Sequence, residues 1–131
     1  EKQFSVIGSQ FIDIGNEFSG GKNIEIHAFE LDPSKPPKIT IGNHVTITDN
    51  CYLSAVGELT VGDGTLLGEN TFICDNFHGR NTFEEIEIPP NDRKITYKGA
   101  VNIRKNVWIG RNVCIMPGVS IGNGSVIGRM L

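Results

Sequence analysis

Residues 101–128 read VNIRKNVWIGRNVCIMPGVSIGNGSVIG and carry the strictest periodicity in the chain. An isoleucine occupies every sixth position from Ile103 to Ile127, and the fifth residue of these hexads is usually small or β-branched. A period of six fits neither an α-helix nor a simple alternating strand. It predicts a short strand and a turn, repeated, in which each isoleucine points inward and stacks on its equivalent one coil above.

The same spacing continues toward the N-terminus. The earlier runs are Ile41, Ile47 and Leu53, then Val61, Leu67 and Ile73, with two residues inserted between the runs. Gly-Asn, Asp-Gly and Asn-Gly dipeptides accompany the repeat and permit positive φ at corners. The many Val, Ile and Thr residues suit parallel strands, and helix signals are nearly absent. We therefore expect residues 1–131 to form one all-β solenoid domain, stabilised by the stacking of its coils.

Two segments interrupt the rhythm, residues 29–38 and residues 79–100, and both contain adjacent prolines. We expect both to be loops extruded between coils. The second is long, and an unstructured segment of that length inside a compact domain is more often functional than a tolerated insertion.

Composition narrows the function classes. The net charge is −3 and the basic residues form no block, which disfavours binding to nucleic acid or to an anionic membrane. No apolar run approaches 18 residues, so no membrane span is expected. The cysteines, Cys51, Cys74 and Cys114, form no CxxC pair, and their odd number predicts free thiols in a reducing cytoplasm. Cys51 takes the small fifth position of its hexad and is expected in the core.

The hexads, the run NVWIG at residues 106–110 and the run IMPGVSIG at residues 115–122 resemble the hexapeptide-repeat acyltransferases. Over residues 39–128 the chain looks like the sugar and polysaccharide O-acetyltransferases related to maltose and galactoside acetyltransferases. The resemblance implies a left-handed parallel β-helix of triangular section with three hexads per coil. It also implies a homotrimer that binds acetyl-CoA in clefts between neighbouring subunits. Family members usually continue past the position of Gly128 with a stretch that completes the last coil, and we expect this chain to lack that end.

The resemblance points to His78 as the catalytic residue. His78 closes the hexad at residues 73–78 and opens the long loop, where the family has its catalytic histidine. A sugar hydroxyl is a poor nucleophile until a base takes its proton, and an imidazole, with an ordinary pKa of about 6.5, suits that task near neutrality. Attack on the thioester gives an oxyanion that requires preorganised donors. The alternative is an exposed loop histidine.

Further candidates follow from the same resemblance. For acetyl-CoA they are Trp108, Gly110, Arg111 and Gly128, with the backbone amide at Arg111 mattering more than its side chain. For the acceptor they are Asp75, Asn76 and Tyr97, with Arg93 and Glu85 as further loop residues. Trp108 can equally pack in a trimer interface. For the Asp75-Asn76 pair, the favoured alternative is a turn at a coil corner, where most Asp-Asn pairs serve that purpose.

The leading hypothesis is direct acetyl transfer from acetyl-CoA to a sugar or polysaccharide-precursor hydroxyl, with His78 as general base and no metal. Transfer to the nitrogen of an amino sugar needs the same base. A non-catalytic trimeric scaffold is a third possibility. A zinc hydrase of the kind built on the same repeat is disfavoured, because it needs a close histidine pair and His27, His44 and His78 are widely spaced.

Overall fold

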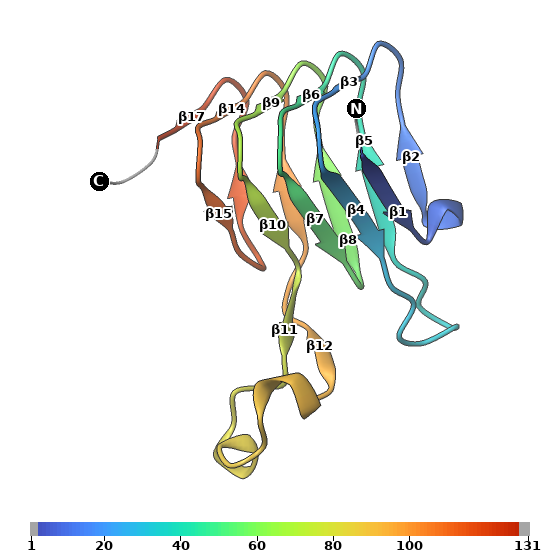
Figure 1. Ribbon diagram of the computed structural model, residues 1–131, viewed down its shortest axis with the longest axis vertical. Helices are drawn as coiled ribbons and strands as arrows, with labels where there is room; N and C mark the ends of the chain where they lie inside the picture. The colour runs from blue at the N-terminus through green and yellow to red at the C-terminus, as the bar shows by residue number, and fades with distance from the viewer. Residues whose placement is uncertain (1–2, 129–131) are drawn as a thin grey trace.

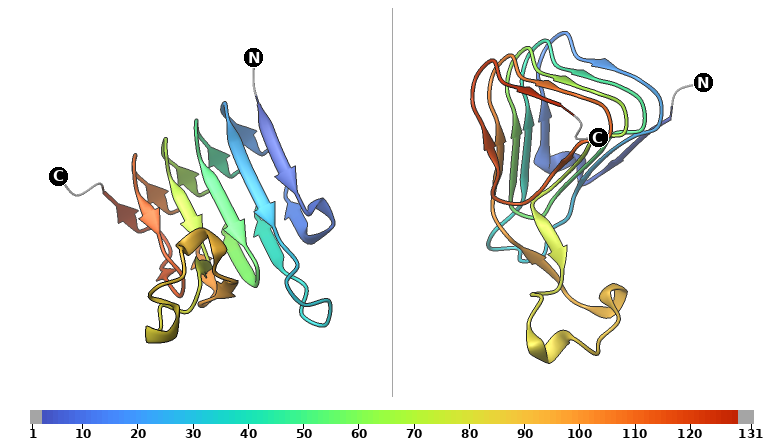
Figure 2. Two further views of the ribbon diagram at one scale, coloured as in Figure 1. Left: turned by 60° about the horizontal axis from the view of Figure 1, so that its bottom comes forward. Right: turned by 90° about the vertical axis from the view of Figure 1, so that its left-hand side faces the viewer.

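The computed structural model describes residues 3–128, which wind into a parallel β-helix of triangular section (Figure 2). Three parallel sheets of five strands form the three faces, and each coil adds one strand to each sheet. The predicted all-β, left-handed parallel β-helix with an extruded segment is confirmed. Within the described residues, no helix combines the length and apolarity that crossing a membrane would take.

The sheets are ordered by coil (Figure 1). The first sheet contains β1 (Phe4–Ile7), β4 (Ile24–Ala28), β7 (Tyr52–Ala55), β10 (Phe72–Cys74) and β15 (Cys114–Ile115). The second sheet contains β2 (Ile12–Ile14), β5 (Lys38–Ile41), β8 (Glu58–Val61), β13 (Val101–Ile103) and β16 (Ser120–Ile121). The third sheet contains β3 (Ser19–Gly20), β6 (Thr46–Ile47), β9 (Leu66–Leu67), β14 (Trp108–Ile109) and β17 (Val126–Ile127). A short 3₁₀ turn, η1 (Ser9–Phe11), joins β1 to β2.

The core consists of the periodic aliphatic residues, stacked in columns. Ile47, Leu67 and Ile109 are in register along the third sheet, and all three have no exposed surface. The periodic residues of the other two sheets stack in the same way, Ile73 on Leu53 in the first sheet and Ile103 on Val61 in the second, and all four have no exposed surface. The predicted inward positions are confirmed for these residues. Cys51, at 1% exposure, fills a core position as predicted.

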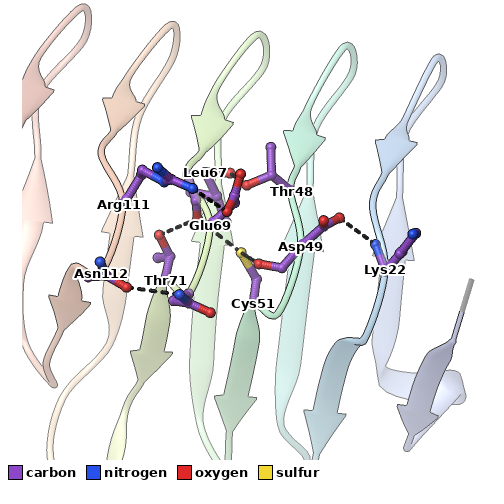
Figure 3. A network of polar contacts seen from close by, with 11 residues as sticks. Lys22, Thr48, Asp49, Cys51, Leu67, Glu69, Thr71, Arg111 and Asn112 are labelled. Carbon is purple, nitrogen blue, oxygen red and sulfur yellow. Dashed lines mark hydrogen bonds and ion pairs between the residues drawn. The ribbon is translucent and has the colours of Figure 1, made fainter.

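Polar residues close the corner between the third and first sheets (Figure 3). Asn50, Asn70 and Asn112 have φ between 58° and 61°, a left-handed conformation that asparagine tolerates better than most side chains. The Nδ2 of Asn70 donates to the Oδ1 of Asn112 at 2.9 Å, one coil away. The hydroxyl of Thr71 donates to the carbonyl of Gly68 at 2.7 Å. These bonds satisfy backbone and side-chain groups where the chain turns and cannot pair in a sheet.

The long insertion differs from its prediction. It is an arm, residues 76–97, in which β11 (Asn76–His78) pairs antiparallel with β12 (Ile95–Tyr97). Two 3₁₀ turns, η2 (Phe83–Glu85) and η3 (Pro90–Asp92), form its outer part (Figure 1). The chain leaves the coil at Asp75, so His78 lies on a strand of the arm and does not close a hexad. The two strands of the arm, β11 and β12, pair with each other, so their backbone N–H and C=O groups are satisfied away from the β-helix.

The shorter insertion matches its prediction closely. It connects β4 to β5 over residues 29–37, one residue shorter than expected, because Lys38 already pairs with Glu58 in the second sheet.

Thiol chemistry should distinguish the cysteines. Cys114 is exposed, whereas Cys51 and Cys74 are buried, and that burial raises the pKa of both thiols. Because the thiolate is the reactive form, we expect a disulfide-exchange dye at pH 8 to label one thiol per chain rapidly. Cys114→Ser should remove this fast phase, and urea should restore reaction at the two other sites. A fast phase that survives Cys114→Ser would contradict the assignment.

Candidate functional site

His78 borders a cleft of about 450 Å³ between the arm and the 29–37 loop. The residues that line the cleft are Phe29, Glu30, Leu31, Tyr52, Ser54, Asn76, His78 and Ile95. The imidazole is exposed and makes no side-chain hydrogen bond within residues 3–128, so both ring nitrogens remain available to a substrate. The cleft therefore presents an unengaged imidazole beside aromatic and polar side chains.

The two insertions meet because they leave the helix at the same corner. The 29–37 loop follows β4 and the arm follows β10, and only β7 lies between these strands in the first sheet. Phe29, Glu30 and Tyr52 also line the cleft and were not predicted from the sequence. The available signal was that each insertion begins three residues after an inward residue of the first sheet, Ile26 or Ile73.

Asn76 shares the cleft with His78, as expected from their alternate positions on one strand. The Nδ2 of Asn76 donates to the hydroxyl of Ser54 at 3.3 Å and to the Oδ1 of Asp75 at 3.0 Å. These contacts hold the amide in place, and its side-chain oxygen is the group that remains for an acceptor.

Asp75 is not a substrate-binding residue in this structure, contrary to the expectation. Its side chain has no exposed surface, and both of its oxygens accept backbone N–H bonds from the neighbouring coil at residues 56–58. The acceptor could reach this carboxylate only if those bonds broke. Asp75 thus has a structural role beside the cleft: it connects the start of the arm to the neighbouring coil.

Tyr97 lies apart from the His78 cleft. Its ring packs on Gly57 and lines a larger hollow of about 840 Å³ between the arm and the 29–37 loop. The side chains of Arg93 and Glu85 make hydrogen bonds within the arm. The Nε of Arg93 donates to the carbonyl of Ile88 at 2.8 Å, and the Oε2 of Glu85 accepts the N–H of Arg80 at 2.6 Å. The larger hollow does not contain His78, so its size alone does not make it the reactive site.

The residues expected near acetyl-CoA lie on another face of the same chain. Trp108 stands on β14 of the third sheet and is 54% exposed. The arm leaves the corner between the first and second sheets, and the third sheet is the opposite face (Figure 2). One chain therefore does not bring His78 and Trp108 together.

Arg111 and the two glycines also lie on or after the third sheet. The guanidinium of Arg111 pairs with Glu69 at 2.6 Å, which raises the pKa of Arg111. The N–H of Gly110 donates to the carbonyl of Ile127 at 2.8 Å and so belongs to the ladder between coils. Gly128 is exposed at the last described coil.

The remaining histidines are engaged within the fold. His27 is 7% exposed, lies in edge contact with Phe29 and Tyr52, and bonds the hydroxyl of Ser5 through Nε2 at 3.1 Å. His44 pairs with Glu17 at 3.1 Å on the surface. Among residues 3–128 no three His, Cys, Asp or Glu side chains are grouped as metal ligands would be.

The C-terminal coils match a known protein family. Residues 100–130 match the family described as "Bacterial transferase hexapeptide (six repeats)". This segment contains the run of isoleucines at steps of six.

Curated relatives are named for acetyl transfer. WbbJ of Escherichia coli K12, named for O-acetyl transfer in lipopolysaccharide biosynthesis, is 31% identical over 121 residues, covering 89% of this chain and 59% of WbbJ. WcaF of the same strain, named for acetyl transfer in colanic acid biosynthesis, is 27% identical over 109 residues, covering 82% of this chain and 54% of WcaF. The chain thus spans a little more than half the length of these relatives.

A solved structure shares the fold. A point mutant of AntD, an N-acyltransferase from Bacillus cereus, aligns with a TM-score of 0.72 at 23% identity, covering 98% of this chain and 65% of AntD. That structure contains dTDP-4-amino-4,6-dideoxyglucose and coenzyme A.

Proposed function

Because this chain belongs to the hexapeptide-repeat transferases, we propose that it transfers an acetyl group from acetyl-CoA to a hydroxyl of a sugar or polysaccharide precursor. The observation that carries the proposal is the position of His78, exposed and unengaged in a cleft between two insertions. The names of WbbJ and WcaF support the reaction class and the kind of acceptor.

His78 is the general base in this proposal. Its unprotonated ring nitrogen takes the proton of the acceptor hydroxyl as the hydroxyl oxygen attacks the thioester carbonyl. The new C–O bond forms, the C–S bond breaks, and the imidazolium returns the proton to the departing thiolate of CoA. Donor and acceptor must be held together for this direct transfer, which a cleft favours.

The cleft suits a sugar ring. Phe29 and Tyr52 supply aromatic surface, while Asn76 and Glu30 supply polar groups that can bond hydroxyls. An amino sugar is the second candidate acceptor, since the chain shares its fold with an N-acyltransferase. The two acceptors need the same base, and only the product separates them.

A homotrimer would complete the site. Trp108 and Val126 on the third sheet are 54% and 64% exposed, and Phe83 at the arm's outer end is 85% exposed. Exposed apolar surface of this kind is typical of an interface. A neighbouring copy that lays its third sheet beside the arm would join Trp108, Gly110, Arg111 and Gly128 to His78, with acetyl-CoA between them.

The proposed location is the cytoplasm. The three cysteines are free, which agrees with a reducing compartment.

Product mass spectrometry tests the proposal. The full-length protein is incubated with acetyl-CoA and a panel of hydroxyl-bearing and amino sugars, free and nucleotide-linked. We expect one acetyl group added to a hydroxyl-bearing acceptor, with release of CoA. An acetyl group found only on amines would replace the O-acetyl proposal by the N-acetyl one. No product and no acetyl-CoA binding by the full-length protein would favour a scaffold.

A further inference from the structure

Asp75 occupies the point at which the chain leaves the helix for the arm. Its carboxylate has no exposed surface. The Oδ1 atom accepts the N–H of Val56 at 2.9 Å, and the Oδ2 atom accepts the N–H of Gly57 at 2.8 Å and of Glu58 at 2.9 Å. A buried carboxylate with this many backbone donors is a strong, charge-assisted connection between two coils.

Asp75 connects both sides of the arm to the same point, one through its backbone carbonyl and the other through its side chain. Its carbonyl accepts the N–H of Lys98, on the returning side of the arm, at 2.8 Å. Its side chain accepts the Nδ2 of Asn76, the first residue of β11, at 3.0 Å. The strand that carries His78 therefore starts at a residue fixed from several directions.

A second contact fixes the arm where it joins the β-helix. The ring of Tyr97, which is paired with Asn76 across the arm, lies directly on Gly57. A Cβ at residue 57 would come within 2.5 Å of the Cδ1 of Tyr97, so only glycine allows this approach. Gly57 is also one of the backbone donors to Asp75. We call Asp75, Gly57 and Tyr97 the arm anchor.

We propose that Asp75 is the positioning residue of the site: through the arm anchor it sets where His78 stands relative to the cleft. The inference rests on the proposed function. His78 is two residues beyond Asn76 on β11. This strand contacts the β-helix mainly at Asn76, where it begins. A shift of the arm anchor would therefore also move the imidazole. Misplacement of a catalytic group by about 1 Å can cost roughly 100-fold in rate.

Asp75→Asn is the decisive variant because it keeps the shape. An amide has one acceptor oxygen, so its NH₂ must face either Val56 and Asn76 or Gly57 and Glu58, donor against donor. In the full-length protein we expect kcat per folded molecule to fall about 10- to 100-fold, with KM for acetyl-CoA little changed. Hydrogen exchange at the amides of residues 56–58 should speed up in the same samples.

Asp63→Asn is the matched control. The Oδ1 of Asp63 accepts the N–H of Asn43 at 2.7 Å, and Asn43 makes the same contact to Asn16 with its own amide oxygen at 2.8 Å. An amide therefore suffices at this corner, and Asp63→Asn should leave kcat within about twofold.

Gly57→Ala keeps the Asp75 side chain but displaces the Tyr97 ring from residue 57, and it should reproduce the loss of kcat. If either anchor variant exposes the 56–58 amides while kcat per folded molecule stays unchanged, the inference is overturned and the proposed function stands. If the wild-type protein transfers no acetyl group while those amides are protected, the proposed function fails and the positioning role fails with it.

Discussion

Replacing His78 with alanine will lower kcat for acetyl transfer by roughly 10²- to 10⁴-fold, the usual contribution of a general base. The acceptor hydroxyl would then have to lose its proton to water within the transition state. Because the imidazole makes no hydrogen bond within residues 3–128, its removal should leave the fold intact. Product formation is measured by mass spectrometry at saturating acetyl-CoA and acceptor.

His44→Asn is the control for this experiment, because His44 has a φ of 56° and asparagine tolerates this conformation. His44 is also exposed, but it lies at a corner of the β-helix, and among the described residues its side chain pairs only with Glu17. Its loss should change neither kcat nor the melting temperature appreciably, since exposed ion pairs contribute about 0–1 kcal/mol. Full activity in His78→Ala would exclude His78 as the base and would direct attention to other groups in the cleft, Glu30 first.

Leu67→Ala should destabilise the protein by roughly 2–5 kcal/mol, the range for a large-to-small change in a packed core. Leu67 has no exposed surface and lies in register between Ile47 and Ile109. A cavity at this position removes contacts on both sides, in the coil above and in the coil below. Urea unfolding followed by circular dichroism gives the change in free energy.

The adjacent Leu66→Ala provides the comparison. Leu66 is on the same strand but faces outward and is only half-buried, in register with Trp108 and Val126. Its replacement should cost clearly less than that of Leu67 in a monomer. Equal losses for the two variants would contradict the inward and outward assignment. A larger loss for Leu66→Ala at high protein concentration would instead indicate that the third sheet is covered by another copy.

Much of the fold was predictable because its rule is local. A hexad repeats the same few interactions, an inward aliphatic residue and a corner that tolerates positive φ, so residues such as Ile103 and Ile121 can be assigned from spacing alone. Stacking then leaves few alternatives, because each coil must cover the apolar residues of the last. The extruded segments were visible as interruptions of this rhythm.

The candidate site was predictable only in part. His78 came from a resemblance at one position, and the structure adds that it shares a cleft with Asn76. Asp75 was expected near the acceptor but is buried as a support, and Tyr97 lies in a different hollow. The hydrogen-bond partners of Asp75 lie 17 to 19 residues earlier in the chain, on the preceding coil. No local sequence pattern predicts contacts over that separation.

The sequence by itself determined the repeat, the inward residues, the corners and the places where the helix is interrupted, because each depends on neighbours within one hexad. Only the tertiary structure decided that the two insertions share a corner, that the chain departs at Asp75, and that His78 and Trp108 lie on different faces. These features depend on which coil lies over which, and residues distant in sequence meet only after the coils have stacked.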